Sequence, residues 1–238
     1  APLSLSTPRS FPSNVFLAQA FDPLVDPKLL FRQQVQPVNL VVHPNPDPHL
    51  LEELRKFFEE RPQTKPVYLS SSSASMKEFF KQLNAQLKIL ELPKALRLSW
   101  LDQMRTCALY LSDSLGCRKP ELIFRTMEST GARHWHVDGD YHEPGCVEED
   151  GKIRLRLLVT YTGQSGTEFV AEDNIIDKTL VESGKHEPTE VLHRPSEVYA
   201  ADIGDICLMR CMLPHGLVHR SPTGDGSRFI LLGRAKER

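Results

Sequence analysis

The chain has 238 residues, of which 40% are hydrophobic and 25% are charged, so its composition is that of an ordinary globular protein with ample material for a core. Twenty-nine basic residues nearly balance 31 acidic residues, and the formal net charge of -2 gives no reason to expect a nucleic acid or an anionic membrane as partner. No apolar run approaches the roughly 20 residues needed to cross a bilayer.

The cysteines indicate a reducing compartment. They are odd in number, scattered, and form no CxxC pair: Cys107, Cys117, Cys146, Cys207 and Cys211. This usage argues against a disulfide framework and against a cysteine-based zinc site. The first residues lack the basic and apolar regions of an intact secretory signal. We therefore expect a cytoplasmic protein.

The N-terminal half predicts extended segments followed by helices. The first 48 residues are rich in proline and turn formers, with an apolar burst at 38–42 that could add one strand. Leucine and phenylalanine then recur at helical spacing in three segments, which we interpret as core packing. These segments are 46–62, 71–90 and 94–116, the last ended by Gly116, and 67–70 could form a strand.

The pattern changes after Pro120 to about eight short β-rich pieces separated by Gly, Pro, Asp and Ser. Such spacing is typical of an antiparallel sandwich or barrel, and eight is the number of strands in a double-sheet jelly roll. We therefore predict an α+β fold, with a jelly-roll core, or double-stranded β-helix, at 120–238. Residues 1–119 would form an N-terminal helical buttress integrated with this core.

The segment RHWHVD contains a candidate metal site. Alternate side chains of a strand share a face, so His134, His136 and Asp138 should point one way. An imidazole and a carboxylate at this spacing can chelate one metal, and a second imidazole from elsewhere would complete a two-histidine, one-carboxylate triad. That triad leaves positions open and is used by non-heme iron(II) oxygenases.

A second motif, PHGLVHRSPTGDGSRFILL, supplies the missing imidazole and a lone arginine. His215 and His219 are both candidates, and we favour His219 because it lies in a strand-like segment nine residues before Arg228. Arg228 stands among apolar residues, where an unpaired charge is costly, and its planar guanidinium suits a carboxylate. A bound 2-oxo acid would supply that carboxylate, and a buried Asp205 or Glu168 is the alternative partner.

The strand KIRLRLLVTYT offers further candidates. Leu155, Leu157, Val159 and Tyr161 share the face expected in the core, whereas Arg154, Arg156, Leu158 and Thr160 share the other. Thr160 or Arg156 could touch a cosubstrate, or the arginines could simply face solvent. Glu168 could be structural or could reach the site mouth.

Two loops and four histidines complete the expectations. The acidic insertion 139–152, which includes His142, could form a rim suited to a basic or neutral substrate or could simply be a solvated loop. The largely polar loop 171–197 is long enough to act as a lid. His43, His49, His186 and His193 are expected at the surface.

The order HxD, distant His, then Arg resembles the iron(II)/2-oxoglutarate-dependent dioxygenases, in which a jelly roll carries the metal between its sheets. The resemblance implies that His136, Asp138 and His219 bind iron(II) and that Arg228 binds the far carboxylate of 2-oxoglutarate. More narrowly, HVD, RLLVTYTGQSGTEF and GLVHRSP are similar to the bacterial family called domain of unknown function 1826, roughly over 120–233.

The chain departs from the dioxygenase pattern at two places. The insertion follows HVD where a short link is expected, and Ile230 stands where many dioxygenases pair the arginine with a serine. Two other functions therefore stay open: a non-catalytic module that holds iron, zinc or another divalent metal, and a cupin-like isomerase or hydrolase that uses the metal as a Lewis acid. Arg228 discriminates, because only the oxygenase needs it as an anchor. The sequence motifs indicate neither the substrate nor the oligomeric state.

Overall fold

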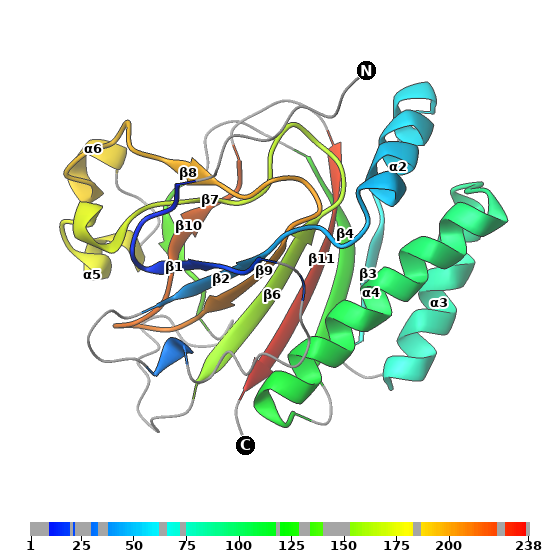
Figure 1. Ribbon diagram of the computed structural model, residues 1–238, viewed down its shortest axis with the longest axis horizontal. Helices are drawn as coiled ribbons and strands as arrows, with labels where there is room; N and C mark the ends of the chain where they lie inside the picture. Colours follow the sequence, from blue (N-terminus) through cyan, green and yellow to red (C-terminus); the bar gives the residue numbers. More distant parts are fainter. Residues whose placement is uncertain are drawn as a thin grey trace.

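The computed structural model describes residues 10–19, 21, 30–32, 38–61, 66–71, 75–117, 120–128, 134–139, 153–182, 187–222 and 227–236. They form an α+β fold with two β-sheets and a helical layer (Figure 1). The large sheet has seven strands in the order β1-β2-β9-β6-β11-β4-β3, and the small sheet has four in the order β5-β10-β7-β8.

All eight β-rich pieces predicted after Pro120 contain a strand. The large sheet consists of β1 (Val15–Leu17), β2 (Leu40–His43), β3 (Tyr68–Ser70), β4 (Glu121–Glu128), β6 (Arg154–Thr160), β9 (Ile206–Arg210) and β11 (Ser227–Lys236). The small sheet consists of β5 (His136–Val137), β7 (Glu168–Phe169), β8 (Tyr199–Ala200) and β10 (Val218–Arg220). From β4 to β11 the chain crosses repeatedly between the sheets, with β4, β6, β9 and β11 in the large one.

The three predicted helices are α2 (Pro48–Glu60), α3 (Met76–Ile89) and α4 (Lys94–Leu115). Local chemistry sets their ends. The side chain of Asp47 accepts a hydrogen bond from the backbone N–H of Leu50, and that of Ser75 accepts one from the backbone N–H of Glu78. These bonds cap the N-termini of α2 and α3. Gly116, with φ of 62°, ends α4 in the left-handed conformation that glycine adopts most readily.

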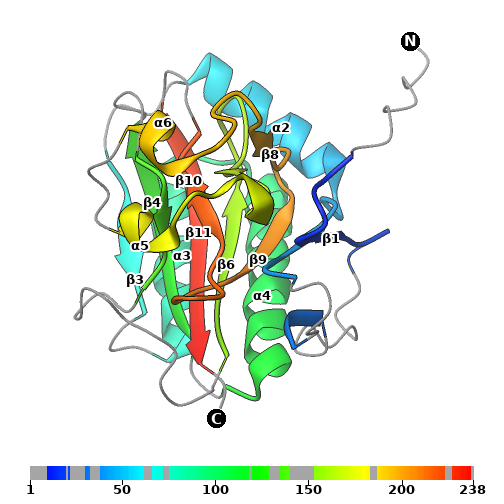
Figure 2. The same ribbon diagram turned by 90° about the vertical axis from the view of Figure 1, so that its left-hand side faces the viewer.

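The helices cover the face of the large sheet opposite the small sheet, as the two views show (Figure 2). Helix α4 contacts β11 and β6, and both α2 and α3 contact α4. Trp100 of α4 is fully buried and packs edge-on against Phe124, Tyr161 and Phe229 of the large sheet, at ring-centroid distances of 5.2–5.7 Å. Helices and sheet therefore share one core, and the division at residue 120 stays a prediction.

The predicted alternation of β6 is confirmed. Leu155, Leu157, Val159 and the following Tyr161 belong to the main hydrophobic core. Arg156 and Thr160, on the other face, point toward the small sheet and line a cavity there. The period-two pattern thus places β6 correctly between a core and a polar site.

The prediction that His43 is a surface residue is wrong. It is fully buried, its Nε2 lies 2.9 Å from the Tyr110 hydroxyl, and its ring packs edge-on against Phe21 and Tyr110. Its partners come from distant segments of the chain, and the polarity of the residues around His43 in the sequence therefore gave the wrong prediction. His49 and His193 are exposed, as expected, and His186 lies outside the described residues.

The expected polar lid at 171–197 is largely a packed layer where the structure describes it. It contains η1 (Glu172–Asn174), α5 (Lys178–Glu182) and α6 (Pro188–Val191). Val181, Val191 and Leu192 are buried against Trp135 and Val218 on the outer face of the small sheet. Residues 140–152 of the acidic insertion, with His142, lie outside the described residues.

Within the described ranges, no helix is long and apolar enough to cross a membrane. In these ranges none of the four cysteines, Cys107, Cys117, Cys207 and Cys211, forms a disulfide with another described cysteine.

Trp100→Ala tests whether helices and sheets unfold together. Loss of this side chain should lower the free energy of unfolding by about 3–5 kcal/mol, because the cavity cannot collapse among packed aromatic rings. Urea melting followed by tryptophan fluorescence and circular dichroism should show one shifted transition. Leu98→Ala, at an exposed position of the same helix, should change stability by less than about 0.5 kcal/mol. Two separate transitions in Trp100→Ala would contradict a shared core.

Candidate functional site

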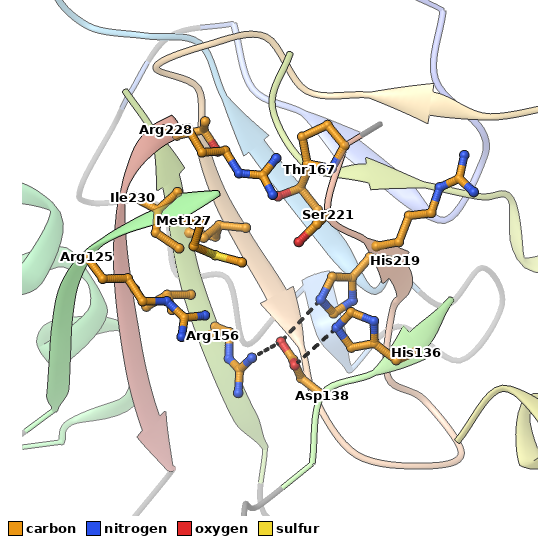
Figure 3. A pocket seen from close by; sticks show the side chains of 15 residues that line it. Arg125, Met127, His136, Asp138, Arg156, Thr167, His219, Ser221, Arg228 and Ile230 are labelled. Carbon is orange, nitrogen blue, oxygen red and sulfur yellow. Dashed lines mark ion pairs between the residues drawn. The ribbon is translucent and has the colours of Figure 1, made fainter. Parts of the chain in front are cut away.

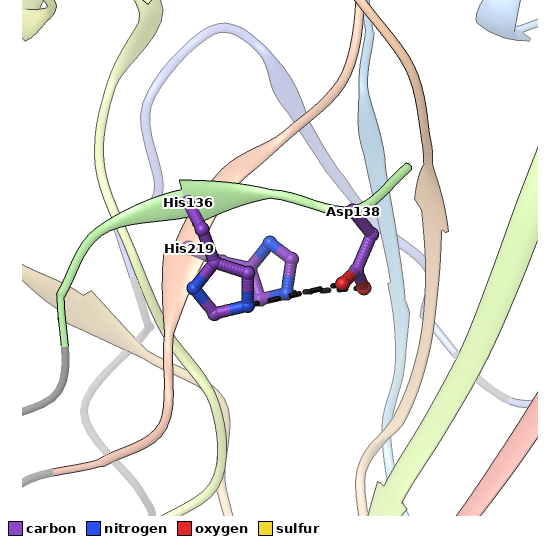
Figure 4. Close-up of side chains that lie close together, drawn as sticks. All are labelled: His136, Asp138 and His219. Carbon is purple, nitrogen blue, oxygen red and sulfur yellow. Dashed lines mark ion pairs between the residues drawn. The ribbon is translucent and has the colours of Figure 1, made fainter. Parts of the chain in front are cut away.

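The pairing of β5 with β10 brings two histidines face to face. These strands are antiparallel, and His219 is the direct partner of His136 in their register. Directly opposed residues project from the same face, so both rings point into the space between the sheets, with centroids 4.4 Å apart. Asp138 follows β5 and turns its carboxylate toward both rings (Figure 4).

The three side chains are spaced as metal ligands. His219 Nε2 lies 3.3 Å from Asp138 Oδ2, and His136 Nε2 lies 3.8 Å from Asp138 Oδ1. All three potential ligand atoms lie within 4.8 Å of one another. Ligands about 2.1 Å from a common metal lie roughly 3–3.5 Å apart, so small movements would close this group around one ion.

Backbone hydrogen bonds orient both imidazoles for coordination. Nδ1 of His136 lies 3.1 Å from the carbonyl oxygen of His134, and Nδ1 of His219 lies 3.0 Å from that of Leu217. A carbonyl only accepts, so Nδ1 carries a proton in each ring, and Nε2 is the atom that each ring turns toward Asp138. Such bonds fix the tautomer of metal-binding histidines.

Charges and burial set the protonation states. Burial and the neighbouring His219 lower the pKa of His136 to about 4, so its ring is neutral at pH 7. Burial alone would raise the pKa of Asp138, but the positive charge of Arg156, followed by the contribution of His219, outweighs burial and holds that pKa below its usual range. Neutral imidazoles and an ionised carboxylate are the forms that bind a metal.

Arg156 of β6 forms an ion pair with Asp138, through Nη1 and Oδ2, across the space between the sheets (Figure 3). Both side chains are buried. The structure thus places Arg156 beside a candidate ligand, where it holds the carboxylate ionised and limits its rotation.

Gly216 lets β10 approach β5 closely. A Cβ atom at this position would come within 2.3 Å of Val137 Cγ1 and 2.7 Å of the Met212 carbonyl oxygen. The preceding residue, His215, is exposed and does not join the group of His136, Asp138 and His219. His134 is also exposed and lies outside this group, because β5 begins only at His136.

The candidate ligands lie at one end of a cavity of about 200 Å³ between the sheets. Its floor is formed by β4, β6 and β11 of the large sheet, and its opposite wall by β5 and β10. The lining residues are Arg125, Met127, His136, Asp138, Arg156, Leu158, Thr160, Thr167, His219, Arg220, Ser221, Pro222, Arg228, Ile230 and Leu232.

Thr160 and Arg228, expected near a cosubstrate, both line this cavity and are buried. Figure 3 shows the Arg228 guanidinium directed toward Thr167, in the part of the cavity away from Arg156. Thr167 and Ser221 add hydroxyl groups to the lining. A cavity with metal-ligand geometry at one end and a buried guanidinium at the other can hold a small acid that chelates a metal.

Glu168 lies next to the site without lining the cavity. Its Oε2 accepts a hydrogen bond from Arg220 Nε at 2.7 Å, and the Arg220 guanidinium lies 4.4 Å from the centroid of Trp135. These residues belong to β7 and β10 and to the turn into β5, and Trp135 and Arg220 adjoin the two candidate ligands in sequence. Glu168 therefore ties together the strands that carry His136 and His219.

Several lining residues were not singled out by the sequence, among them Arg125, Met127, Thr167 and Ser221. A signal for Arg125 existed in ELIFRTM, where alternation puts Ile123, Arg125 and Met127 on one face. Which face meets the cavity depends on pairing with β11, and sequence periodicity alone does not give that register.

Comparisons with known proteins give a family and a set of distant structural similarities. The family model described as protein of unknown function (DUF1826) matches residues 26–232, and comparison with curated proteins gives no match. The chain is similar to EvdO2 from Micromonospora carbonacea var. aurantiaca complexed with 2-oxoglutarate, with 11% identity over 89% of this chain and 91% of that chain and a TM-score of 0.42.

Two further solved structures are similar at the same level. A Pseudomonas putida prolyl-4-hydroxylase shows 12% identity, coverage of 84% of this chain and 93% of that chain, and a TM-score of 0.39. HygX from Streptomyces hygroscopicus, with nickel and 2-oxoglutarate bound, shows 13% identity, coverage of 82% and 81%, and a TM-score of 0.41.

Glu168→Gln tests the tie between the ligand-bearing strands. A hydrogen bond to a charged group contributes roughly 1.5–3 kcal/mol, and we expect its loss to lower the free energy of unfolding by that amount in urea melts. Glu52→Gln is the matched control: Glu52 also lies 2.7 Å from an arginine, Arg55, but both side chains are about half exposed. Its loss should cost less than about 1 kcal/mol. Equal effects of the two changes would contradict a structural role for Glu168.

Proposed function

The chain belongs to the DUF1826 family of proteins of unknown function, and from that premise we propose that it is an iron(II)- and 2-oxoglutarate-dependent dioxygenase acting on an unidentified substrate. One observation carries the proposal. His136, Asp138 and His219 meet in a cavity whose lining also includes a buried arginine, Arg228.

The donor set favours iron(II) over a structural zinc. Two imidazole nitrogens and one carboxylate oxygen occupy one side of an octahedral ion and leave three positions open, as in non-heme iron(II) oxygenases. Structural zinc sites usually have four protein ligands. Within the described residues, these three are the group of His, Cys, Asp and Glu side chains close enough to share an ion.

Arg228 distinguishes the dioxygenase from the two alternatives. A metal-storage module or a Lewis-acid isomerase needs no buried guanidinium across the cavity, whereas 2-oxoglutarate has a second carboxylate that must be held. The guanidinium can bind it through two parallel hydrogen bonds. Thr167 and Ser221 are our candidates for the second anchor, since Ile230 cannot provide one. Thr160 lines the floor beside them.

The strand order supports a double-stranded β-helix. Strands β4 to β11 are divided four to each sheet, with the sheets facing each other across the candidate site. We propose that these strands are the jelly roll at 120–238 and that α2, α3 and α4 are its helical buttress. The shared core around Trp100 supports one integrated domain.

Bound iron(II) would supply the activation of dioxygen with 2-oxoglutarate as reductant, and the chain's own residues would bind and orient the reactants. His136, Asp138 and His219 would hold the metal on one side. Arg156 would keep Asp138 ionised, and Arg228 would fix the cosubstrate at its far carboxylate. Leu158, Ile230 and Leu232 on the floor would limit the access of water.

Alanine substitutions test the metal ligands. His136→Ala, Asp138→Ala and His219→Ala should each lose stoichiometric iron(II), because two remaining ligands hold a labile ion poorly. His215→Ala is the matched control and should keep it. The measurement is the metal-to-protein ratio after anaerobic loading and desalting, with circular dichroism to verify folding. Full occupancy in a folded His136→Ala or Asp138→Ala variant would refute the triad.

Arg228→Lys tests the oxygenase. The variant should keep iron(II) but bind 2-oxoglutarate about ten- to a hundredfold more weakly, because lysine retains the charge and loses one of two hydrogen bonds. Titration of 2-oxoglutarate into the anaerobic iron(II) protein, followed by the metal-to-ligand charge-transfer band, gives the midpoint. Succinate formation in air then tests turnover. Absence of the band in the parent protein, or an unchanged midpoint in the variant, would leave a metal-binding protein without a case for this enzyme class.

A further inference from the structure

Arg125 is a cationic residue on the cavity floor that neither the metal nor the cosubstrate requires. It lies on β4 opposite Ile230 of β11, which in turn faces Thr160 of β6. Arg125 is half-buried, and its Nε is buried without a hydrogen-bond partner. Within the part of the chain that the structure describes, its guanidinium forms no ion pair.

The other arginines of the lining have roles that Arg125 does not share. Arg156 pairs with Asp138, and Arg220 pairs with Glu168 and lies over Trp135. Arg228 is assigned to the cosubstrate. Asp138 is the single carboxylate among the described lining residues, and Arg156 already contacts it.

Arg125 also lies close to another positive charge. Arg228 pairs with Met127, so Arg125 and Arg228 occupy diagonal positions on one face of adjacent strands. Diagonal neighbours have Cβ atoms about 7–8 Å apart. The two arginines thus add two positive charges to the lining of a cavity in which Asp138 is the single described carboxylate, and this balance favours the binding of anions.

The two guanidinium groups serve different parts of the cavity. In Figure 3 Arg228 points toward Thr167, whereas Arg125 extends toward the end where Arg156 and Asp138 lie. Met127 and Ile230 separate them on the floor. This arrangement favours two anion subsites over a single clamp in which both arginines hold one carboxylate.

We propose that Arg125 binds a carboxylate of the primary substrate, so that the enzyme oxidises a small organic acid. The planar fork of arginine matches a carboxylate, and the apolar Met127, Leu158 and Ile230 suit an aliphatic chain attached to it. The cavity volume of about 200 Å³ is below the roughly 300–1,000 Å³ of common ligand pockets, which limits the part of the substrate that enters. The inference rests on the proposed function, because Arg228 is taken to be occupied by 2-oxoglutarate.

A matched pair of probes tests the proposal. Pentanoate and pentanamide have the same carbon chain, but only pentanoate is charged. Each is titrated by calorimetry into the anaerobic iron(II) protein saturated with 2-oxoglutarate. The parent should bind pentanoate at least about tenfold more tightly than pentanamide, and Arg125→Gln should reduce this preference to less than about twofold. Arg125→Lys, which keeps the charge, should give an intermediate preference and guards against misfolding in the first variant.

Two controls separate this role from others. Arg61→Gln removes an exposed arginine at the end of α2, paired with Glu91, and should leave the preference unchanged. The midpoint for 2-oxoglutarate should change by less than about twofold in Arg125→Gln. A larger rise would assign Arg125 to the cosubstrate and overturn the proposal, as would equal or undetectable binding of both probes to the parent.

Failure of the proposed function is recognised separately. If the parent gives no charge-transfer band, the same probes are titrated into the metal-free protein, its Arg125→Gln variant and its Arg228→Gln variant. A preference for pentanoate that is lost in Arg125→Gln and kept in Arg228→Gln would support a carboxylate site at Arg125 without an oxygenase. The reverse pattern, or no preference, would overturn the site itself.

Discussion

The register between β5 and β10 is the constraint on which the candidate site depends, because it sets His219 opposite His136. Strands this short contribute few hydrogen bonds and are marginal by themselves. They are held from outside, where Val181, Val191 and Leu192 pack on Trp135 and Val218. Lys178 of α5 also donates to the carbonyl oxygens of Pro214 and Gly216, in the loop that leads into β10. A slip of one residue in either strand would turn the imidazole of that strand out of the cavity, so the outer layer maintains the geometry of the inner one.

The buried charge of the site is also balanced by residues from both sheets. Asp138 is a buried carboxylate, which would be costly alone, and it is compensated from both sheets: Arg156 approaches from β6, and the imidazoles from β5 and β10. Arg156 thus makes the anion tolerable in the interior, while the imidazole protons are directed away toward backbone carbonyls. What remains at the centre is one carboxylate and the Nε2 atoms of two imidazoles, a donor set that suits a divalent cation.

Sequence patterns predicted the features that depend on local order. The helices followed from apolar spacing and from caps such as Ser75 and Gly116, and the two faces of β6 followed from its alternation. HxD spacing singled out His136 and Asp138 because these two candidate ligands lie within three consecutive residues, where strand alternation places them on one face. Features that depend on contacts between distant segments were missed. The burial of His43 requires Phe21 and Tyr110, and the pairing of Glu168 with Arg220 requires the register of β7 with β10. The described part of 171–197 contains short helices and buried valines, and its sequence has no strong helical or strand periodicity from which they could be predicted.

Arg125 shows where folding and binding make opposite demands on one surface. The floor around it accepts apolar side chains, since Met127, Ile230 and Leu232 lie on the same face of the same two strands. Arg125 forms no ion pair with a described residue, so its charge is not part of a salt bridge that holds this floor together. In our proposal a substrate carboxylate supplies the negative charge that the described lining does not offer to this guanidinium. Arg125 would then differ from Arg156, which pairs with the chain's own Asp138, in taking its negative partner from a ligand.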